Sequence, residues 1–246
     1  MQNSLSVVIP SYNEEKRLPA TLERVADYLQ RQPSRKSEIL VVNDGSSDRT
    51  ADISREMAGK IESGNLSVRV LDNPGNRGKG YSVRHGAAES RYDWVLFTDA
   101  DLSAPIEECD KLLAAVIDGS HEIAIGSRAL ARSLIGVHQP LFREMMGRAF
   151  NLVVRVTTGL PYADTQCGFK LFSARAAHDI FPKQQLERFG FDVEILFLAR
   201  KYGFKVAEVP VRWNDVEGTK VAAFSGADAF LDILRVRRND WLGKYE

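Results

Sequence analysis

Two aspartates follow a short apolar run near the middle of the chain. Asp99 and Asp101 come directly after residues 94–98, whose apolar and β-branched side chains predict a buried strand. Because α/β proteins bind ligands beyond the carboxyl ends of their strands, we expect both carboxylates at a binding edge. Mg²⁺ and Mn²⁺ prefer such oxygen ligands, and substrate phosphates commonly complete their coordination. The alternative is that both aspartates cap a helix beginning near Pro105.

The turns after the first two predicted strands carry side chains that suit a nucleoside. The first strand leads into Pro10, Tyr12 and Glu14, which offer an aromatic face and a carboxylate. The second strand ends at Asp44, which could accept a hydrogen bond from a base or a ribose. Asp48 follows, and we expect it to cap the next helix.

A glycine-rich basic loop covers residues 73–80, Asn-Pro-Gly-Asn-Arg-Gly-Lys-Gly. Its glycines allow close approach to the backbone, and Arg77 and Lys79 suit a diphosphate. An NAD site would instead need G-x-G-x-x-G after the first strand, and a P-loop would need a glycine-rich turn ending in Lys-Ser or Lys-Thr. Neither motif follows the first predicted strand, which argues against an NAD-binding protein and against a P-loop NTPase.

Strands and helices must position these residues, and the sequence predicts them from short β-branched runs that alternate with helical patterns. Strands are predicted at residues 5–10, 38–43, 68–71, 94–98 and 123–126, and helices at 15–31, 48–60, 78–90 and 105–118. The second half predicts helices at 141–158, 192–202 and 227–237 and strands at 168–173 and 205–212. The alternation is typical of an α/β fold with a mainly parallel central sheet.

The second half has too few predicted strands for a core of its own. We therefore predict a single domain over residues 1–246, with two functional halves at about 1–126 and about 127–246. The formal net charge is zero, so nothing global indicates nucleic acid binding. Only two cysteines occur, without zinc spacing, and neither a secretory signal nor an apolar run long enough to span a bilayer is visible. We expect a cytoplasmic protein.

The order of the motifs resembles the family 2 glycosyltransferases of the GT-A (Rossmann-like) fold. The residues are Pro-Ser-Tyr-Asn-Glu at 10–14, Asn-Asp-Gly-Ser at 43–46, Gly-Lys-Gly at 78–80 and the DXD motif Asp-Ala-Asp at 99–101. Gly-Ser-Arg at 126–128, Asp-Thr-Gln-Cys-Gly-Phe-Lys at 164–170 and residues 188–194 further resemble polyprenyl-phosphate sugar transferases, particularly the dolichyl-phosphate β-glucosyltransferases. The resemblance covers about residues 5–221.

This resemblance implies an inverting hexosyltransferase with a UDP-sugar donor, expected to be UDP-glucose, and a polyprenyl-phosphate acceptor of the dolichyl type. It implies that the nucleoside side of the donor is bound by Pro10, Tyr12, Glu14, Asp44 and Asp99, with Lys79 close by. It also implies that Asp101, with Asp99, holds Mn²⁺ or Mg²⁺. Lys220 matches a family loop that closes over the donor phosphates. Residues 1–126 would then bind the nucleotide sugar and 127–246 the acceptor.

Ser103 departs from the related dolichyl-phosphate mannose synthases, which commonly carry Gln at this position as a further metal ligand. A hydroxyl is a weaker ligand than an amide oxygen. Ser103 is therefore either a weak contributor to the metal site or only a helix cap.

Three arginines are candidates for gripping an acceptor phosphate, because guanidinium offers paired donors: Arg128, Arg143 and Arg148. We expect at least one of them to be a solvated surface residue. A phosphate monoester is largely ionised near neutral pH, since its second pKa is about 6, so it requires no strong base.

An alcohol acceptor would need deprotonation, and Asp192 or Glu194 would then be the candidate base. With either acceptor, Asp164, Gln166 and Asp192 could bind sugar hydroxyls. For Asp192 the alternative is a helix cap.

Two helical patterns combine apolar and basic residues, as helices at a membrane surface do. In residues 141–155 apolar side chains recur at helical intervals with Arg143, Arg148 and Arg155 among them, although a core helix would look similar. In residues 227–238 the same pattern favours a core helix that ends in arginines. We expect peripheral association with the cytoplasmic face of a membrane.

The leading hypothesis is glucose transfer from UDP-glucose to a polyprenyl phosphate. Two alternatives stay open. One keeps the donor chemistry but uses a hydroxyl acceptor or GDP-mannose, and the other is a non-catalytic nucleotide-sugar sensor.

Overall fold

The computed structural model describes residues 4–137, 141–215 and 226–246. A seven-stranded sheet forms its centre, in the order β3 (Leu66–Asp72), β2 (Ser37–Asn43), β1 (Leu5–Ser11), β4 (Trp94–Thr98), β7 (Phe169–Ser173), β5 (Ile123–Ser127) and β8 (Val206–Pro210). Strand β7 runs antiparallel to its neighbours β4 and β5, and the other pairings are parallel. The predicted mainly parallel α/β sheet is confirmed.

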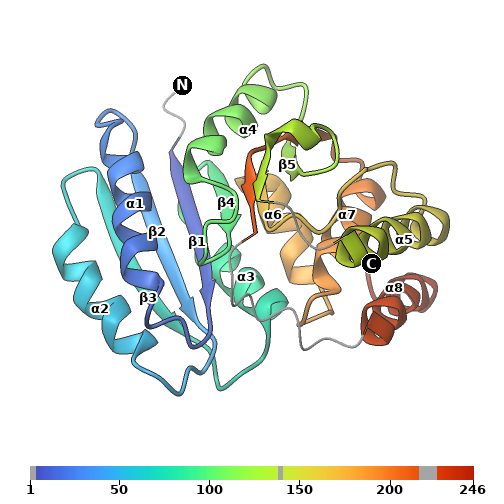
Figure 1. The fold of residues 1–246 in the computed structure, drawn as a ribbon, viewed down its shortest axis with the longest axis horizontal. Coiled ribbons are helices and arrows are strands. Elements are labelled where there is room, and N and C mark those ends of the chain that lie inside the picture. The colour runs from blue at the N-terminus through green and yellow to red at the C-terminus, as the bar shows by residue number, and fades with distance from the viewer. Residues whose placement is uncertain (1–3, 138–140, 216–225) are drawn as a thin grey trace.

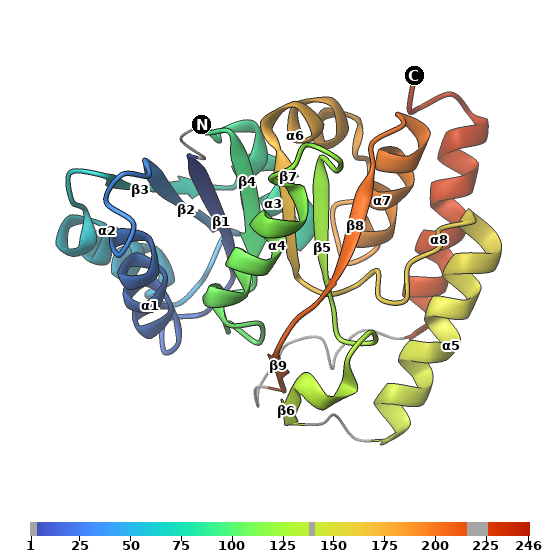
Figure 2. The same cartoon turned by 90° about the horizontal axis from the view of Figure 1, so that it is seen from above.

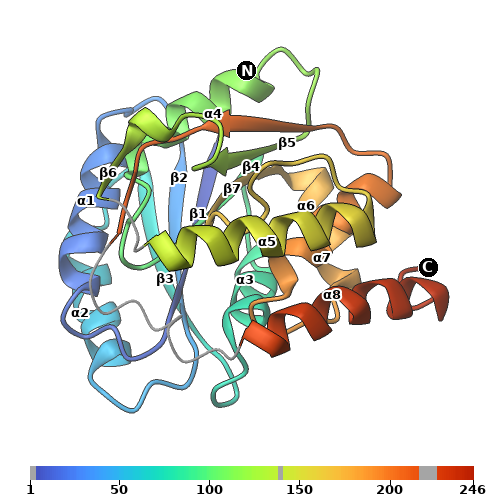
Figure 3. The same ribbon diagram turned by 45° about the vertical axis from the view of Figure 1, so that its right-hand side comes forward.

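Helices cover both faces of this sheet (Figures 1 and 2). One face carries α1 (Leu18–Gln30), α2 (Thr50–Ile61) and α4 (Cys109–Val116), and the other carries α3 (Lys79–Ala88), α6 (Ala174–Ile180) and α7 (Phe191–Lys201). Beyond α7 lie α5 (Leu141–Thr158) and α8 (Gly226–Trp241), which run side by side (Figures 2 and 3). Three short 3₁₀ turns are η1 (Ile106–Glu108), η2 (Arg132–Leu134) and η3 (Phe181–Lys183).

The sequence explains why these elements form. Strand β2 contains the apolar run at residues 39–42, and all seven of its residues are buried because helices cover both faces. Helix α1 has a proline in its first turn, and it buries Leu18, Leu22, Val25 and Leu29 along one stripe. Two apolar cores result, one on each side of the sheet.

The antiparallel direction of β7 is the main feature of the sheet that the sequence analysis did not predict. Thr98, at the carboxyl end of β4, pairs with Phe169, the first residue of β7. The segment that leads into β7 therefore approaches the edge of the sheet where Asp99 and Asp101 lie. Periodicity alone does not reveal strand direction, so the sequence did not predict this approach.

A two-stranded ribbon of β6 (Ile135–Val137) and β9 (Trp213–Asn214) extends below the carboxyl ends of the parallel strands (Figure 2). Neither strand was predicted, because both are very short. Among the helices of the described ranges, none is long and apolar enough to cross a bilayer.

Candidate active site

The turn at residues 99–101 is held by hydrogen bonds from two other elements. Thr21 Oγ1 on α1 donates to the carbonyl of Ala100 (2.6 Å). The amide of Asn214 in β9 donates to the carbonyl of Ser103 (2.9 Å). The position of both carboxylates is thus set by the fold around β4 and not by the local turn alone.

The backbone of this turn adopts an uncommon conformation. Leu102 has φ +47°, in the left-handed region that bulky residues rarely occupy. The amide of Ser103 donates to Asp101 Oδ1 (2.9 Å). No side chain caps η1, whose N-cap residue is Pro105, so the helix-cap interpretations of both aspartates and of Ser103 are wrong.

Lys79 lies against the first of these carboxylates. Its Nζ is 2.5 Å from Asp99 Oδ1. Burial lowers the pKa of Lys79, but Asp99, Asp192 and Asp101 outweigh this effect and raise it above the usual value. A Cβ on Gly168 would overlap the Asp99 carboxylate and lie 2.9 Å from Lys79 Nζ. Gly168 therefore leaves room for this ion pair, a role that spacing alone did not predict.

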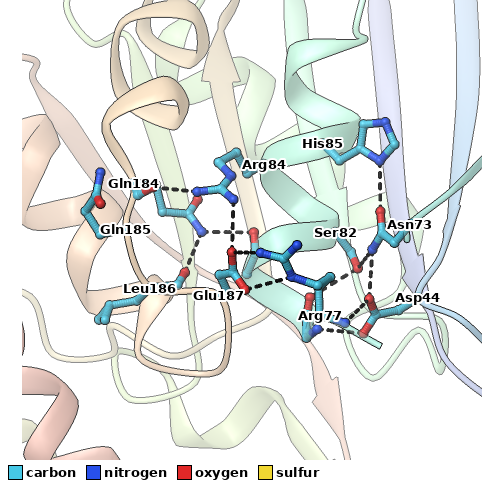
Figure 4. A network of polar contacts seen from close by, with 12 residues as sticks. Asp44, Asn73, Arg77, Ser82, Arg84, His85, Gln184, Gln185, Leu186 and Glu187 are labelled. Atoms are coloured by element: carbon cyan, nitrogen blue, oxygen red, sulfur yellow. Dashed lines mark hydrogen bonds and ion pairs between the residues drawn. The ribbon is translucent and has the colours of Figure 1, made fainter. Parts of the chain in front are cut away.

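Asp44 orders the basic loop that precedes Lys79 (Figure 4). Its Oδ1 accepts from Asn73 Nδ2 (2.8 Å) and from the amide of Arg77 (2.9 Å), and its Oδ2 accepts from the amide of Gly78 (2.7 Å). These bonds fix the loop at the start of α3. Contact between Asp44 and a base or ribose stays a prediction.

Arg77, which the sequence suggested for a diphosphate, pairs with Glu187 (Figure 4). Its Nε and Nη2 donate to the two Glu187 oxygens at 3.0 and 2.5 Å. Arg84 Nη1 donates to the carbonyl of Gln184 (2.7 Å), and both guanidinium groups lie over the Tyr81 ring. Residues 184–187 thus hold the start of α3 in place through these hydrogen bonds. No motif in the sequence indicated Glu187.

The turn after β1 is tied to the turn after β2. The amide of Ser47 donates to Asn13 Oδ1 (2.8 Å), and Asn13 itself has φ +53°. The neighbouring Tyr12 side chain is 38% exposed, while Pro10 and Glu14 are half-buried. Because β1 and β4 are parallel, these three residues lie at the same edge of the sheet as Asp99, and their contact with a nucleoside stays a prediction.

Asp48 binds the start of α2 as predicted, although the N-cap residue of that helix is Arg49. Asp48 Oδ1 accepts a hydrogen bond from the amide of Thr50 (2.9 Å), the first residue of α2. Asp48 Oδ2 also accepts from the amide of Glu15 (3.2 Å), which ties the first turn to the second.

Arg128 and Asp164, predicted separately, form a two-pronged ion pair. Arg128 Nε and Nη2 donate to the two carboxylate oxygens of Asp164 at 2.6 and 2.8 Å. The amide of Gln166 also donates to Asp164 Oδ1 (3.2 Å). Burial raises the pKa of Asp164, but the Arg128 guanidinium lowers this pKa by a larger amount. The net pKa of Asp164 is therefore below its usual value.

A pH dependence follows from this pair. Because the folded-state pKa of Asp164 is depressed, its stabilising contribution is complete above the unfolded pKa of about 3.9 and is lost as the pH falls through the folded value. We expect the difference in free energy of unfolding between wild type and Asp164→Asn to be constant at neutral pH and to shrink below about pH 4. Urea unfolding across pH 3–7 would measure it. A difference that grew toward low pH would contradict the assignment.

Asp192 is held by a lysine that the sequence analysis did not single out as a functional residue. Lys170 is fully buried and its Nζ binds both Asp192 Oδ1 and the carbonyl of Cys167. The ammonium group also lies 5.2 Å from the centre of the Phe97 ring. The N-cap residue of α7 is Gly190, so the cap interpretation of Asp192 is wrong. The sequence signal that could have identified Lys170 is the presence of a lysine within the mostly apolar strand β7.

Glu194 lies two residues after Asp192 in α7 and contacts other groups. Its Oε1 accepts from Tyr245 Oη (2.6 Å) and the amide of Gln185 (3.0 Å), and its Oε2 accepts from the amide of Leu186 (2.8 Å). Burial raises the pKa of Glu194. These contacts anchor the 184–187 segment and the C-terminal residues, and an acceptor role for Glu194 stays a prediction.

Three predicted basic residues are not described at the site. Lys220 lies outside the described residues. Arg143 and Arg148 fall within α5, but their side chains are also outside the described part of the structure.

Asp99 and Asp101 are carboxylates of the kind that could hold a divalent cation. Within residues 4–137, 141–215 and 226–246, no group of three or more His, Cys, Asp or Glu side chains is arranged to hold a metal by itself. Mg²⁺ is commonly bound by one or two carboxylates together with substrate phosphates and water. Two carboxylates beside a basic loop match that mode of binding.

The model of the family described as "Glycosyl transferase family 2" matches residues 6–181. This chain belongs to glycosyl transferase family 2. Curated relatives of this glycosyltransferase include the dolichyl-phosphate β-glucosyltransferase of Homo sapiens, which is 36% identical over 96% of this chain and 77% of that protein. The enzyme of the same name from Saccharomyces cerevisiae is 34% identical over 98% and 76%.

Solved glycosyltransferase structures share the GT-A fold of this chain. Glucosyl-3-phosphoglycerate synthase from Mycobacterium tuberculosis, in complex with UDP, aligns with a TM-score of 0.66 at 16% identity over 95% of this chain and 80% of that chain. A mannosyltransferase from Pyrobaculum calidifontis, in complex with GDP-Man and Mn²⁺, aligns with a TM-score of 0.61 at 15% identity over 100% and 63%. The predicted fold class is confirmed.

Proposed function

We propose that this glycosyltransferase moves glucose from UDP-glucose to dolichyl phosphate or a similar polyprenyl phosphate, with inversion at the anomeric carbon. The names of the curated relatives support this sugar and acceptor. The observation that carries the proposal is the cluster of Asp99, Lys79 and Asp101 at the carboxyl edge of the sheet. Such a cluster suits a diphosphate donor with its cation.

The donor half would comprise about residues 1–126 of the single domain. Tyr12, Pro10 and Glu14 would face the nucleoside, and the loop anchored by Asp44 would approach the diphosphate. Asp101 and Asp99 would hold Mn²⁺ or Mg²⁺, which when bound would stabilise the charge on the departing diphosphate. Lys79 would add a positive charge on the protein side.

The acceptor half would comprise about residues 127–246 and would position a phosphate monoester. An ionised oxygen of that phosphate attacks C1 of glucose, the bond between C1 and the UDP oxygen breaks, and UDP leaves with the bonding electrons. Arg128, Arg143 and Arg148 are proposed to orient the phosphate, and Asp164, Gln166 and Asp192 to bind sugar hydroxyls. The chain needs no strong base for this reaction.

The contacts of the two candidate bases favour a phosphate over an alcohol acceptor. Both Glu194 oxygens already accept hydrogen bonds. Asp192 is paired with the buried Lys170 ammonium, which already occupies one of its carboxylate oxygens.

The test is release of UDP from UDP-glucose with Mn²⁺, with and without a short dolichyl phosphate, and with GDP-mannose as a second donor. We expect lipid-dependent release from UDP-glucose that Asp101→Ala reduces by at least about a hundredfold. Asp118→Ala is the matched control, because within the described residues this exposed aspartate accepts its hydrogen bonds from Ser120 of the same turn. Donor binding without lipid-dependent release would contradict the proposal and favour a hydroxyl acceptor or a sensor.

We also propose that α5 and α8 rest on the cytoplasmic surface of a membrane. Large apolar side chains are exposed along the outer faces of both helices: Met145, Leu152, Val153 and Val156 on α5, and Leu231, Leu234 and Trp241 on α8. Ile233 and Val236 of α8 are buried in the core, as predicted for a core helix, but Leu231 and Leu234 on the other face are exposed. Exposed arginines at positions 155, 235, 237 and 238 suit anionic headgroups.

Single charge substitutions should weaken this contact. Leu234 is 58% exposed, and burying a leucine in an apolar layer contributes about 1.5–3 kcal/mol. We expect Leu234→Glu to reduce binding to phosphatidylserine-containing vesicles by about tenfold or more, as measured by vesicle sedimentation. Ile117→Glu is the control, because Ile117 is 66% exposed at the end of α4 and away from both helices. Equal effects of the two variants would contradict the proposal.

A further inference from the structure

Lys79 occupies the centre of a group of carboxylates. Its Nζ is 2.5 Å from Asp99 Oδ1, and its charge also interacts with Asp192 and Asp101. The Lys79 side chain is only 17% exposed. Gly168 borders the ion pair closely on one side, since an added Cβ there would lie 2.7 Å from Asp99 Cγ and 2.9 Å from Lys79 Nζ.

The backbone before Lys79 is fixed, so the reach of its ammonium group is limited. Lys79 is the first residue of α3, and the N-cap residue Gly78 has φ +109°. Asp44 binds the amides of Arg77 and Gly78. A positive charge at a helix N-terminus is disfavoured by the helix dipole, so Lys79 depends on nearby anions. In the described structure Asp99 is the anion in direct contact.

Charge balance indicates what happens when a donor arrives. Asp99, Asp101 and Asp192 provide three carboxylates, and Lys79 and Lys170 provide two ammonium groups. A divalent cation alone would reverse the sign of this local charge, and a diphosphate alone would make it more negative. The two together leave it nearly unchanged, because the charges of cation and diphosphate offset each other.

We propose that Lys79 is an internal counter-ion of the Asp99–Asp101 pair, which competes with the divalent cation until a donor diphosphate attracts the ammonium group away from Asp99. Cation and nucleotide then bind cooperatively, and neither binds tightly alone. The inference deepens the proposed function and rests on it, since it assumes a diphosphate donor with a divalent cation at this site.

A purely structural ion pair would behave differently. If Lys79 only joined α3 to the end of β4, its removal would loosen Asp99 and weaken cation binding or leave it unchanged. If Lys79 competes with the cation, its removal must strengthen cation binding in the absence of nucleotide. The two roles therefore predict effects of opposite sign.

The experiment is a titration of the nucleotide-free protein with Mn²⁺, in which electron paramagnetic resonance measures the free ion. We expect Lys79→Met to bind Mn²⁺ about tenfold more tightly than wild type, because a neighbouring positive charge has been removed. The titration is repeated with UDP. Because coupling between two ligands is reciprocal, the factor by which UDP tightens Mn²⁺ binding should be large in wild type and at least about tenfold smaller in Lys79→Met.

Three further variants make the titration specific. Lys79→Arg retains the charge and should bind nucleotide-free Mn²⁺ as weakly as wild type. Lys79→Gln replaces Lys79→Met if the latter does not fold, as judged by circular dichroism. Lys111→Met is the matched control, since Lys111 Nζ is also 2.5 Å from a carboxylate, that of Glu108 on the opposite face of the sheet. It should leave Mn²⁺ binding unchanged.

Unchanged or weaker nucleotide-free Mn²⁺ binding by the folded Lys79 variant would overturn the inference, and so would a wild type that binds no Mn²⁺ even with UDP. The titration requires no turnover, so the inference can fail while wild type still transfers glucose to dolichyl phosphate. Failure of that transfer, with cooperative Mn²⁺ and UDP binding intact, would overturn the proposed acceptor and leave the role of Lys79 supported.

Discussion

Gly168→Ala is expected to lower kcat/KM for UDP-glucose by about a hundredfold while the fold is retained. The new Cβ would overlap the Asp99 carboxylate and crowd Lys79 Nζ. Both groups are at the ends of side chains, so they can move without disturbing the backbone. Displacement of a positioning group by about 1 Å can reduce turnover about a hundredfold. Kinetics of UDP release and thermal unfolding, measured on the same preparation, would separate the two effects.

Gly59→Ala is the matched control for this substitution. Gly59 lies in α2, and a Cβ at that position would meet no atom within 4 Å. Alanine in a helix is also slightly favoured over glycine, so stability should stay equal or rise. If Gly168→Ala retained turnover within about threefold of Gly59→Ala, the precise placement of Asp99 would not matter for the reaction.

Lys170→Met is expected to lower the free energy of unfolding by about 3–5 kcal/mol, because it leaves the Asp192 carboxylate buried without its partner. Lys170 is fully buried and the Asp192 side chain is 5% exposed. Denaturant unfolding measures the change. The double variant Lys170→Met with Asp192→Asn should recover part of the loss, since it removes the unpaired charge as well.

An exposed pair provides the comparison. Lys201 Nζ is 2.6 Å from Asp240 Oδ1, but the two side chains are 29% and 24% exposed. Lys201→Met should therefore cost less than about 1 kcal/mol. If Lys170→Met cost no more than Lys201→Met, the buried pair would not anchor Asp192 as the structure indicates.

Much of this protein is determined by local sequence patterns. The apolar runs and helical periodicities predicted most of the strands and helices, because side-chain period follows directly from backbone geometry. Asp99 and Asp101 were placed correctly at the end of β4, since a strand end and the residues after it are neighbours in sequence. The same holds for Asp48, whose bond to the start of α2 spans two residues.

Tertiary structure decided the partners of these residues. Strand β7 inserts antiparallel between β4 and β5, and this brings Gly168 against Asp99 and Lys79. Arg128 binds Asp164, which is 36 residues away in the sequence, and Lys170 binds Asp192, which is 22 residues away. No local pattern encodes such pairings, because they depend on strand order and direction. The sequence thus determined which groups could do chemistry, and the packing of the sheet determined which of them hold one another in place.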